Sequence, residues 1–219
     1  MDIKFLSIPV ALTGGAGGSY LGYRYLHQET PKESIKSKLG NLLLEFGDNF
    51  SGKWQDRATL VSSKNDLPES LSKLKTSGSN ISSEAIKGWC KEHIEKEFTS
   101  ETDALFVGIR NYCTFNNKDK LTGKAISETL DNSNLKSNGQ WSKANGKLKQ
   151  VDDNQLSPKM KEIKDKIKDT ASPKDDKALK NWCETTYTEY FKDLNDQNFK
   201  DAESYCTEVT QSVAGAVSP

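Results

Sequence analysis

The sequence has few of the side chains that most catalytic and metal sites require. Its 219 residues include only two histidines and four cysteines. Cys90-x-x-His93 resembles half of a zinc site, but no second half follows, and the other histidine, His27, lies far away in the chain. Gly-x-Ser-x-Gly and Cys-x-x-Cys motifs are both absent. We therefore expect no catalytic residues, no metal, no cofactor and no enzymatic activity.

An excess of either charge is also missing. The 31 basic and 31 acidic residues balance, so nothing favours a nucleic-acid partner. The paired carboxylates Asp152-Asp153 and Asp175-Asp176 lie in lysine-rich stretches, which is typical of solvated surfaces. Hydrophobic residues make up only 34% of the chain. The core is therefore expected to be thin, and a covalent staple would help to stabilise it.

Charged residues are absent from residues 5–23. At about 1.5 Å per residue, this stretch spans roughly 28 Å as a helix, close to the thickness of a hydrocarbon core. Gly14, Gly18 and Gly22 recur at four-residue spacing and would form a smooth strip for packing against a second membrane helix. We expect residues 1–29 to be an uncleaved signal anchor, with its linker, that binds the lipid bilayer.

Two other interpretations of this segment stay open. Phe5–Leu12 could be the apolar region of a cleaved secretory signal, with small residues for cleavage at Gly14-Gly15-Ala16. The second interpretation is that these residues form a glycine-rich soluble segment. A lipid-modified cysteine is excluded because no cysteine lies nearby, and the glycines lack the lysine of a phosphate-binding loop.

The four cysteines reveal an internal repetition. Trp89-Cys90 is followed by Tyr112-Cys113-Thr114, and Trp182-Cys183 is followed by Tyr205-Cys206-Thr207. Both cysteine pairs are 23 positions apart, and the second block lies 93 residues after the first. Phe98 and Phe191 match at the same offset, whereas Trp54 and Trp141 match at 87. We therefore expect two tandem units, residues 30–122 and 123–212, followed by a tail at 213–219.

Helical periodicity surrounds the cysteines and predicts an all-α fold. The midpoint of each cysteine pair lies among turn-forming residues, at 99–102 and 195–198. Two antiparallel helices joined there would bring Cys90 opposite Cys113 and Cys183 opposite Cys206. The predicted fold is thus a membrane helix plus two helical repeats, each with a stapled hairpin. Buried free thiols are the alternative, and the choice depends on export from the cytosol.

Further details of the repeats can be predicted. Ser172-Pro173 has the pattern of a helix N-cap, and Ser82 or Ser83 could cap the first hairpin. Residues 35–46 and 125–135 are expected to be helical. Trp54 and Trp141 lie in polar, Gly/Asn/Ser-rich surroundings and are interpreted as anchors that plug a loop into each core, with ligand stacking as the alternative. The expected core anchors are Trp54, Trp89, Trp141, Trp182, Tyr112 and Tyr205.

The glycine-rich apolar N-terminus, the Lys/Asn-rich body and the Trp-Cys … Tyr-Cys-Thr blocks together resemble the expanded paralogous families of uncharacterised proteins in haemotropic mycoplasmas. The resemblance implies an exported, surface-displayed protein that diversifies under immune pressure, and it implies no activity. We therefore expect a single-pass membrane protein with an extracellular body that contacts host surface molecules or varies antigenically. The alternative is a cytoplasm-facing or envelope scaffold that self-associates through Gly14, Gly18 and Gly22.

Overall fold

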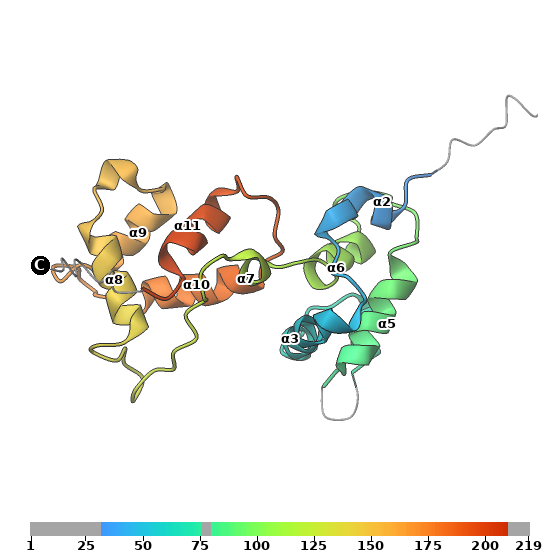
Figure 1. Ribbon diagram of the computed structural model, residues 1–219, viewed down its shortest axis with the longest axis horizontal. Helices are drawn as coiled ribbons and strands as arrows, with labels where there is room; N and C mark the ends of the chain where they lie inside the picture. The colour runs from blue at the N-terminus through green and yellow to red at the C-terminus, as the bar shows by residue number, and fades with distance from the viewer. Residues whose placement is uncertain (1–31, 76–79, 210–219) are drawn as a thin grey trace, which may run out of the picture. The chain divides into compact units, whose positions relative to one another are not determined.

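The computed structural model describes residues 32–75 and 80–209, and within these ranges the fold is helical, as expected (Figure 1). The described residues contain isolated β-bridges but no strands. The α-helices are α2 (Ile35–Leu39), α3 (Ser51–Ser62), α4 (Glu69–Ser72), α5 (Ser83–His93), α6 (Ala104–Tyr112), α7 (Asn117–Lys120), α8 (Gln140–Gln150), α9 (Pro158–Ile167), α10 (Ala178–Thr188) and α11 (Gln197–Tyr205). Short 3-10 turns lie at Gly40–Leu42, Asp48–Phe50 and Asp153–Gln155.

Side-chain caps set the starts of the hairpin helices. The Ser82 hydroxyl accepts a hydrogen bond from the Ala85 amide at 3.1 Å, so Ser82, one of the two serines expected, caps α5. Asp103 caps α6 by accepting the Phe106 amide at 2.9 Å, and Asp196 caps α11 in the same way. Each cap satisfies an amide that has no partner within its own helix.

Several local predictions are wrong in whole or in part. Of residues 35–46, only Ile35–Leu39 form an α-helix, followed by a 3-10 turn at Gly40–Leu42. Helix α10 begins at Ala178, not after Ser172, because the chain first turns back and the Asp175 amide binds the Lys166 carbonyl at 2.9 Å. Residues 125–135 contain no helix. Here Asn132 and Ser133 adopt positive φ angles of 44° and 68° inside a turn, a conformation that ends any helical run.

The buried side chains form two hydrophobic clusters. The first lies among α2, α3, α4, α5 and α6, and the second lies among α8, α9, α10 and α11 (Figure 1). Phe191, before α11, and Phe199, within α11, also belong to the first cluster. The largest fully buried side chains of the first are Ile35, Leu44, Trp54, Leu71, Ile86 and Ile109, and those of the second are Ile126, Trp141, Leu148, Met160 and Ile167. The described residues from Ser34 onward belong to one compact unit despite this division.

Hairpins of the expected kind occur in both clusters, since α5 packs on α6 and α10 packs on α11. Within the described ranges, the structure has no helix of sufficient length and apolar character to cross a bilayer. The expected membrane segment, residues 1–29 with Gly14, Gly18 and Gly22, lies outside the described residues.

Candidate functional site

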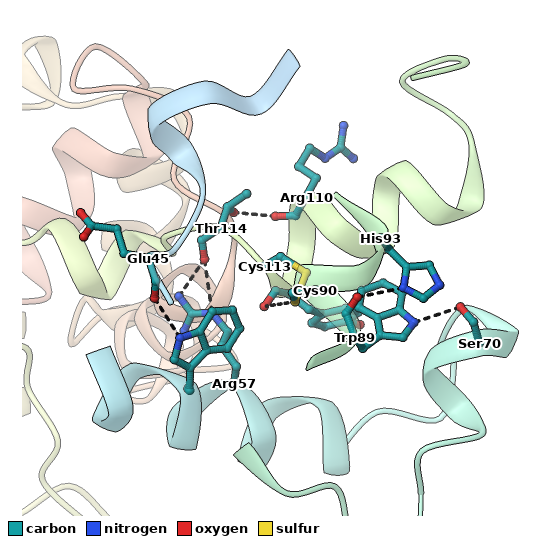
Figure 2. The surroundings of a disulfide bond; sticks show 11 residues. Glu45, Arg57, Ser70, Trp89, Cys90, His93, Arg110, Cys113 and Thr114 are labelled. Carbon is teal, nitrogen blue, oxygen red and sulfur yellow. Dashed lines mark hydrogen bonds between the residues drawn. A yellow bond between two sulfur atoms is a disulfide. The ribbon is translucent and has the colours of Figure 1, made fainter. Parts of the chain in front are cut away.

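A disulfide lies at the centre of each hairpin, with the pairing expected from the spacing. Cys90 bonds to Cys113 and Cys183 bonds to Cys206, and the Cα atoms in each pair are 5.6 Å apart. All four cysteines have 0% exposure. Figure 2 shows the first disulfide between the backbones of α5 and α6, with Trp89 and Arg57 nearby. Each bond ties the two helices of one hairpin together inside its core.

Tryptophans pack in or against both cores, as expected, but Trp54 and Trp141 were expected to do so from loops. Trp54 and Trp141 lie within α3 and α8 and not in loops. Both are only 1% exposed, and each indole N–H donates to a backbone carbonyl at 3.0 Å, of Glu45 and Glu128 respectively. A buried indole needs such an acceptor. With so little surface exposed, neither ring offers a face for stacking a ligand.

The remaining anchor positions differ between the two hairpins. Trp89 is 4% exposed and Tyr112 is 8% exposed. Trp89 donates to the Ser70 hydroxyl at 3.1 Å and stacks on His93 with a centroid distance of 4.8 Å (Figure 2). Their counterparts Trp182 and Tyr205 are only partly buried against the second core. The first hairpin is therefore more completely enclosed than the second.

His93, which suggested half of a zinc site, is buried against its own helix and packs on Trp89. Nδ1 of His93 lies 2.8 Å from the Trp89 carbonyl oxygen, which fixes the ring on its own helix. Across the described ranges, no group of three or more Cys, His, Asp or Glu side chains is close enough together to hold a metal ion.

Contacts that close the first hairpin recur in the second. Phe98 meets Phe106 edge-on with centroids 4.9 Å apart, and Phe191 meets Phe199 at the same distance. The β-bridge Ser34–Glu97 recurs as Asn116–Tyr190, and Leu43–Thr114 recurs as Ala125–Thr207. Between each bridge and its recurrence, the residue named first moves 82 positions along the sequence. The residue named second moves 93 positions. The second set of contacts therefore begins at Asn116, ahead of Gly123.

A buried ion pair lies where the two sets of contacts meet. Arg57 from α3 is 1% exposed, and its guanidinium binds the carboxylate of Asp119 in α7 and the carbonyl of Thr114. Lys53 reaches the same carboxylate at 2.9 Å. Burial alone would raise the pKa of Asp119, but Arg57, Lys53 and the Asn116 amide together hold that pKa below its ordinary value. The pair thus stays charged and links the first core to the start of the second.

This ion pair has no counterpart elsewhere in the described chain. The residue 87 positions after Arg57 is Ala144, and the residue 82 positions before Asp119 is Ser37. Neither can form such a pair. The charges therefore mark one particular junction and are not a general feature of the repeated contacts.

A second cation reaches across the same junction. The Arg110 guanidinium stacks on the Tyr190 ring at 4.7 Å and on the Phe106 ring at 5.7 Å. At the equivalent position of the second hairpin, Glu203 accepts hydrogen bonds from the Thr122 and Gly123 amides at 3.1 and 3.4 Å. The same position thus contacts the other hairpin in one case and the segment at Thr122–Gly123 in the other.

The junction also contains a groove. Its volume is about 630 Å³, and it lies between Leu60, Asp66 and Tyr112 of the first half and Glu189 and Tyr190 of the second. A smaller hollow of about 310 Å³ shares Leu60 and Thr188 with it. This size is typical of small-molecule sites. No sequence pattern predicted the groove, because its residues come from three separate segments, within 60–66, 111–117 and 185–198.

Partial burial in the groove shifts the pKa values of two of its ionisable groups. Burial raises the pKa of Glu189, with Asp196 adding to the effect and Lys192 opposing it. Burial, supplemented by the charge of Asp66, also raises the pKa of the Tyr112 hydroxyl. Lys192 is paired with Asp196 at 3.2 Å. Asp66 and Glu189 form no ion pair with any described residue, so both carboxylates are available to a ligand.

No protein-family model matches the sequence, and neither a curated protein nor a solved structure is significantly similar to it.

Proposed function

We propose that this protein is an exported, non-enzymatic binding protein, anchored in the cell membrane by residues 5–23, with its disulfide-bonded body facing the exterior. The observation that supports this proposal best is the pair of fully buried disulfides, Cys90–Cys113 and Cys183–Cys206. Such bonds persist in oxidising compartments and are rare in the cytosol. The body would there contact host surface molecules and vary under immune pressure.

We further infer that the two hairpin cores descend from one duplicated unit. The matched β-bridges and aromatic pairs support this inference, as do the matched disulfides. A contact that occurs at only one place between the two copies supports a binding role. Arg57 and Asp119 fix one copy against the other at a single junction, where the groove also lies. Duplication would thus have created a surface that neither copy has alone.

The redox state of the cysteines in native cells tests the proposal. Cells would be lysed directly into denaturant containing an alkylating reagent, because thiols with 0% exposure would otherwise escape reaction. Mapping of the peptides should recover Cys90 linked to Cys113 and Cys183 linked to Cys206. Four alkylated cysteines would contradict export and support the cytoplasm-facing scaffold.

Protease treatment of intact cells tests which way the body faces. Lys136 lies in an exposed stretch of the chain without helix, so trypsin should cut there before it cuts within the cores. Complete protection of the body, while a known surface protein is removed, would contradict surface display. A cytosolic protein measured in parallel would show that the cells stayed intact.

A further inference from the structure

The chain contains two Asn-Gly pairs, Asn138-Gly139 and Asn145-Gly146, and the fold places them in opposite environments. Asparagine is among the chemically labile residues. It reacts most readily before glycine, because glycine has no side chain to hinder the attack of its own amide nitrogen on the asparagine side chain. The two pairs share this local chemistry, so their surroundings decide which of them reacts.

Asn138 lies near the end of the loop that joins α7 to α8 (Figure 1). Residues 136–138 are all exposed and belong to no helix. The Gly139 amide donates to the Lys136 carbonyl at 3.0 Å, so a turn bond must break before that nitrogen can react. An exposed turn opens at small cost in free energy. Asn138 can therefore reach the reactive geometry while both cores stay folded.

Asn145 is protected by the same helix that Asn138 precedes. It lies within α8 and is only 7% exposed, and its side-chain amide donates to the Asp176 carbonyl at 2.8 Å. Ring closure between the side chain and the next amide requires a backbone ψ angle that an α-helix does not have. Asn145 can therefore react only when α8 opens and the bond to Asp176 breaks.

We propose that Asn138 deamidates spontaneously and that the isoaspartate product weakens the second core. The Gly139 nitrogen attacks Cγ of Asn138, a new C–N bond forms, and the side-chain amide leaves as ammonia, which takes up the proton that the nitrogen has lost. Water then adds to one carbonyl of the resulting succinimide and breaks the bond from that carbonyl to nitrogen. Opening at Cγ gives aspartate at position 138. Opening at the backbone carbonyl gives isoaspartate, in which the main chain runs through the side-chain carbon atoms.

The residue that follows Asn138 is packed too closely to absorb this change. Gly139 is the N-cap of α8 and is buried, and a Cβ there would clash with the Glu128 carboxylate. Oε2 of Glu128 is buried and has no hydrogen-bond partner among the described residues. The Glu128 carbonyl also accepts the Trp141 indole N–H at 3.0 Å. Isoaspartate lengthens the main chain directly before Gly139 and adds a negative charge beside it, so the contact that anchors Trp141 should loosen.

The test uses the full chain with its disulfides intact, incubated in warm, mildly alkaline buffer. Trypsin separates the two sites because Lys143 lies between them, and mass spectrometry of timed samples follows each peptide. Asn138 should convert at least roughly tenfold faster than Asn145, because Asn145 must wait for α8 to open. In urea that unfolds the chain the two rates should converge. Asn138→Gln is the matched control, since its longer side chain disfavours ring closure and conversion at this position should stop.

A second measurement tests the effect on the core. Ion exchange would isolate the deamidated fraction, and Asn138→Asp carries the same charge on a normal main chain. The deamidated fraction should unfold at a lower urea concentration than this variant, because only isoaspartate displaces Gly139. The proposal is overturned if Asn145 converts as fast as Asn138 in the folded chain, if position 138 converts only in urea, or if the deamidated fraction and Asn138→Asp unfold together.

Discussion

Gly108 in α6 offers a sharp test of the packing in the first hairpin. A Cβ atom at this position would lie 2.5 Å from Cγ of Pro68 and 3.4 Å from Cη2 of Trp89. The proline ring is fixed to its own backbone and cannot rotate aside. Gly108→Ala must therefore push α6 away from the segment before α4.

The magnitude follows from two opposing effects. Overpacking of this kind costs about 1–3 kcal/mol. Replacement of glycine by alanine within a helix stabilises it by about 1 kcal/mol. Gly108→Ala should therefore destabilise the first core by up to about 2 kcal/mol. In the double variant Pro68→Ala, Gly108→Ala the obstructing ring is gone, so the two substitutions should show a coupling energy of about 1–3 kcal/mol.

Urea denaturation with intact disulfides, followed by tryptophan fluorescence, would measure the effect. Gly88→Ala is the matched control, because Gly88 lies within α5 and a Cβ there meets nothing within 4 Å. It should stabilise the protein by about 0.5–1 kcal/mol. The reasoning is refuted if Gly108→Ala proves as stable as Gly88→Ala.

The second hairpin suggests how this contact can be replaced. At the positions equivalent to Pro68 and Gly108 lie Ser157 and Asp201, and the Ser157 hydroxyl donates to the Asp201 carboxylate at 2.5 Å. Gly108→Asp alone should disrupt the first hairpin by overpacking and by burying an unpaired charge. Addition of Pro68→Ser should restore much of the loss. A double variant no more stable than Gly108→Asp would show that the two hairpins pack differently here.

Three further predictions concern covalent and polar links. Cys113→Ser should destabilise the first core by about 3 kcal/mol, because the bond closes a loop of about two dozen residues; limited proteolysis should then cut that core while sparing the second. Asp119→Asn leaves the buried Arg57 without its carboxylate and should cost about 3 kcal/mol at pH 7. Because the pKa of Asp119 is lowered by folding, its contribution is present above about pH 4 and is lost as the pH falls further, so the urea midpoints of wild type and variant should converge on acidification. Glu203→Ala removes the acceptor of the Thr122 amide and should speed hydrogen exchange there, whereas unchanged exchange would show that the contact is unimportant.

Much of the fold could be read from local patterns. The even spacing of the cysteines around turn-forming residues predicted both hairpins and both disulfides, because antiparallel helices of equal length bring equidistant residues together. The N-cap at Ser82 could be read because a cap depends on a few consecutive residues. Ser172 has a similar local pattern, but no helix begins there. The Asp175 amide instead donates to the Lys166 carbonyl, and α10 begins at Ala178.

The placement of Trp54 and Trp141 shows where composition misleads. Their glycine- and asparagine-rich surroundings favour loops, but both residues lie within helices. Burial of a large ring in a core outweighs a weak local preference. Tertiary packing thus chose the secondary structure of these segments.

The sequence by itself determined the helical class, and the spacing of the cysteines predicted the two hairpins and the pairs Cys90–Cys113 and Cys183–Cys206, since these depend on periodicity and spacing along the chain. Tertiary structure alone decided the junction. Arg57 and Asp119 are 62 residues apart, and the carboxylates Asp66 and Glu189 of the groove are still farther apart in the chain. No local pattern marks such pairs, because their proximity follows from how one hairpin core packs against the next.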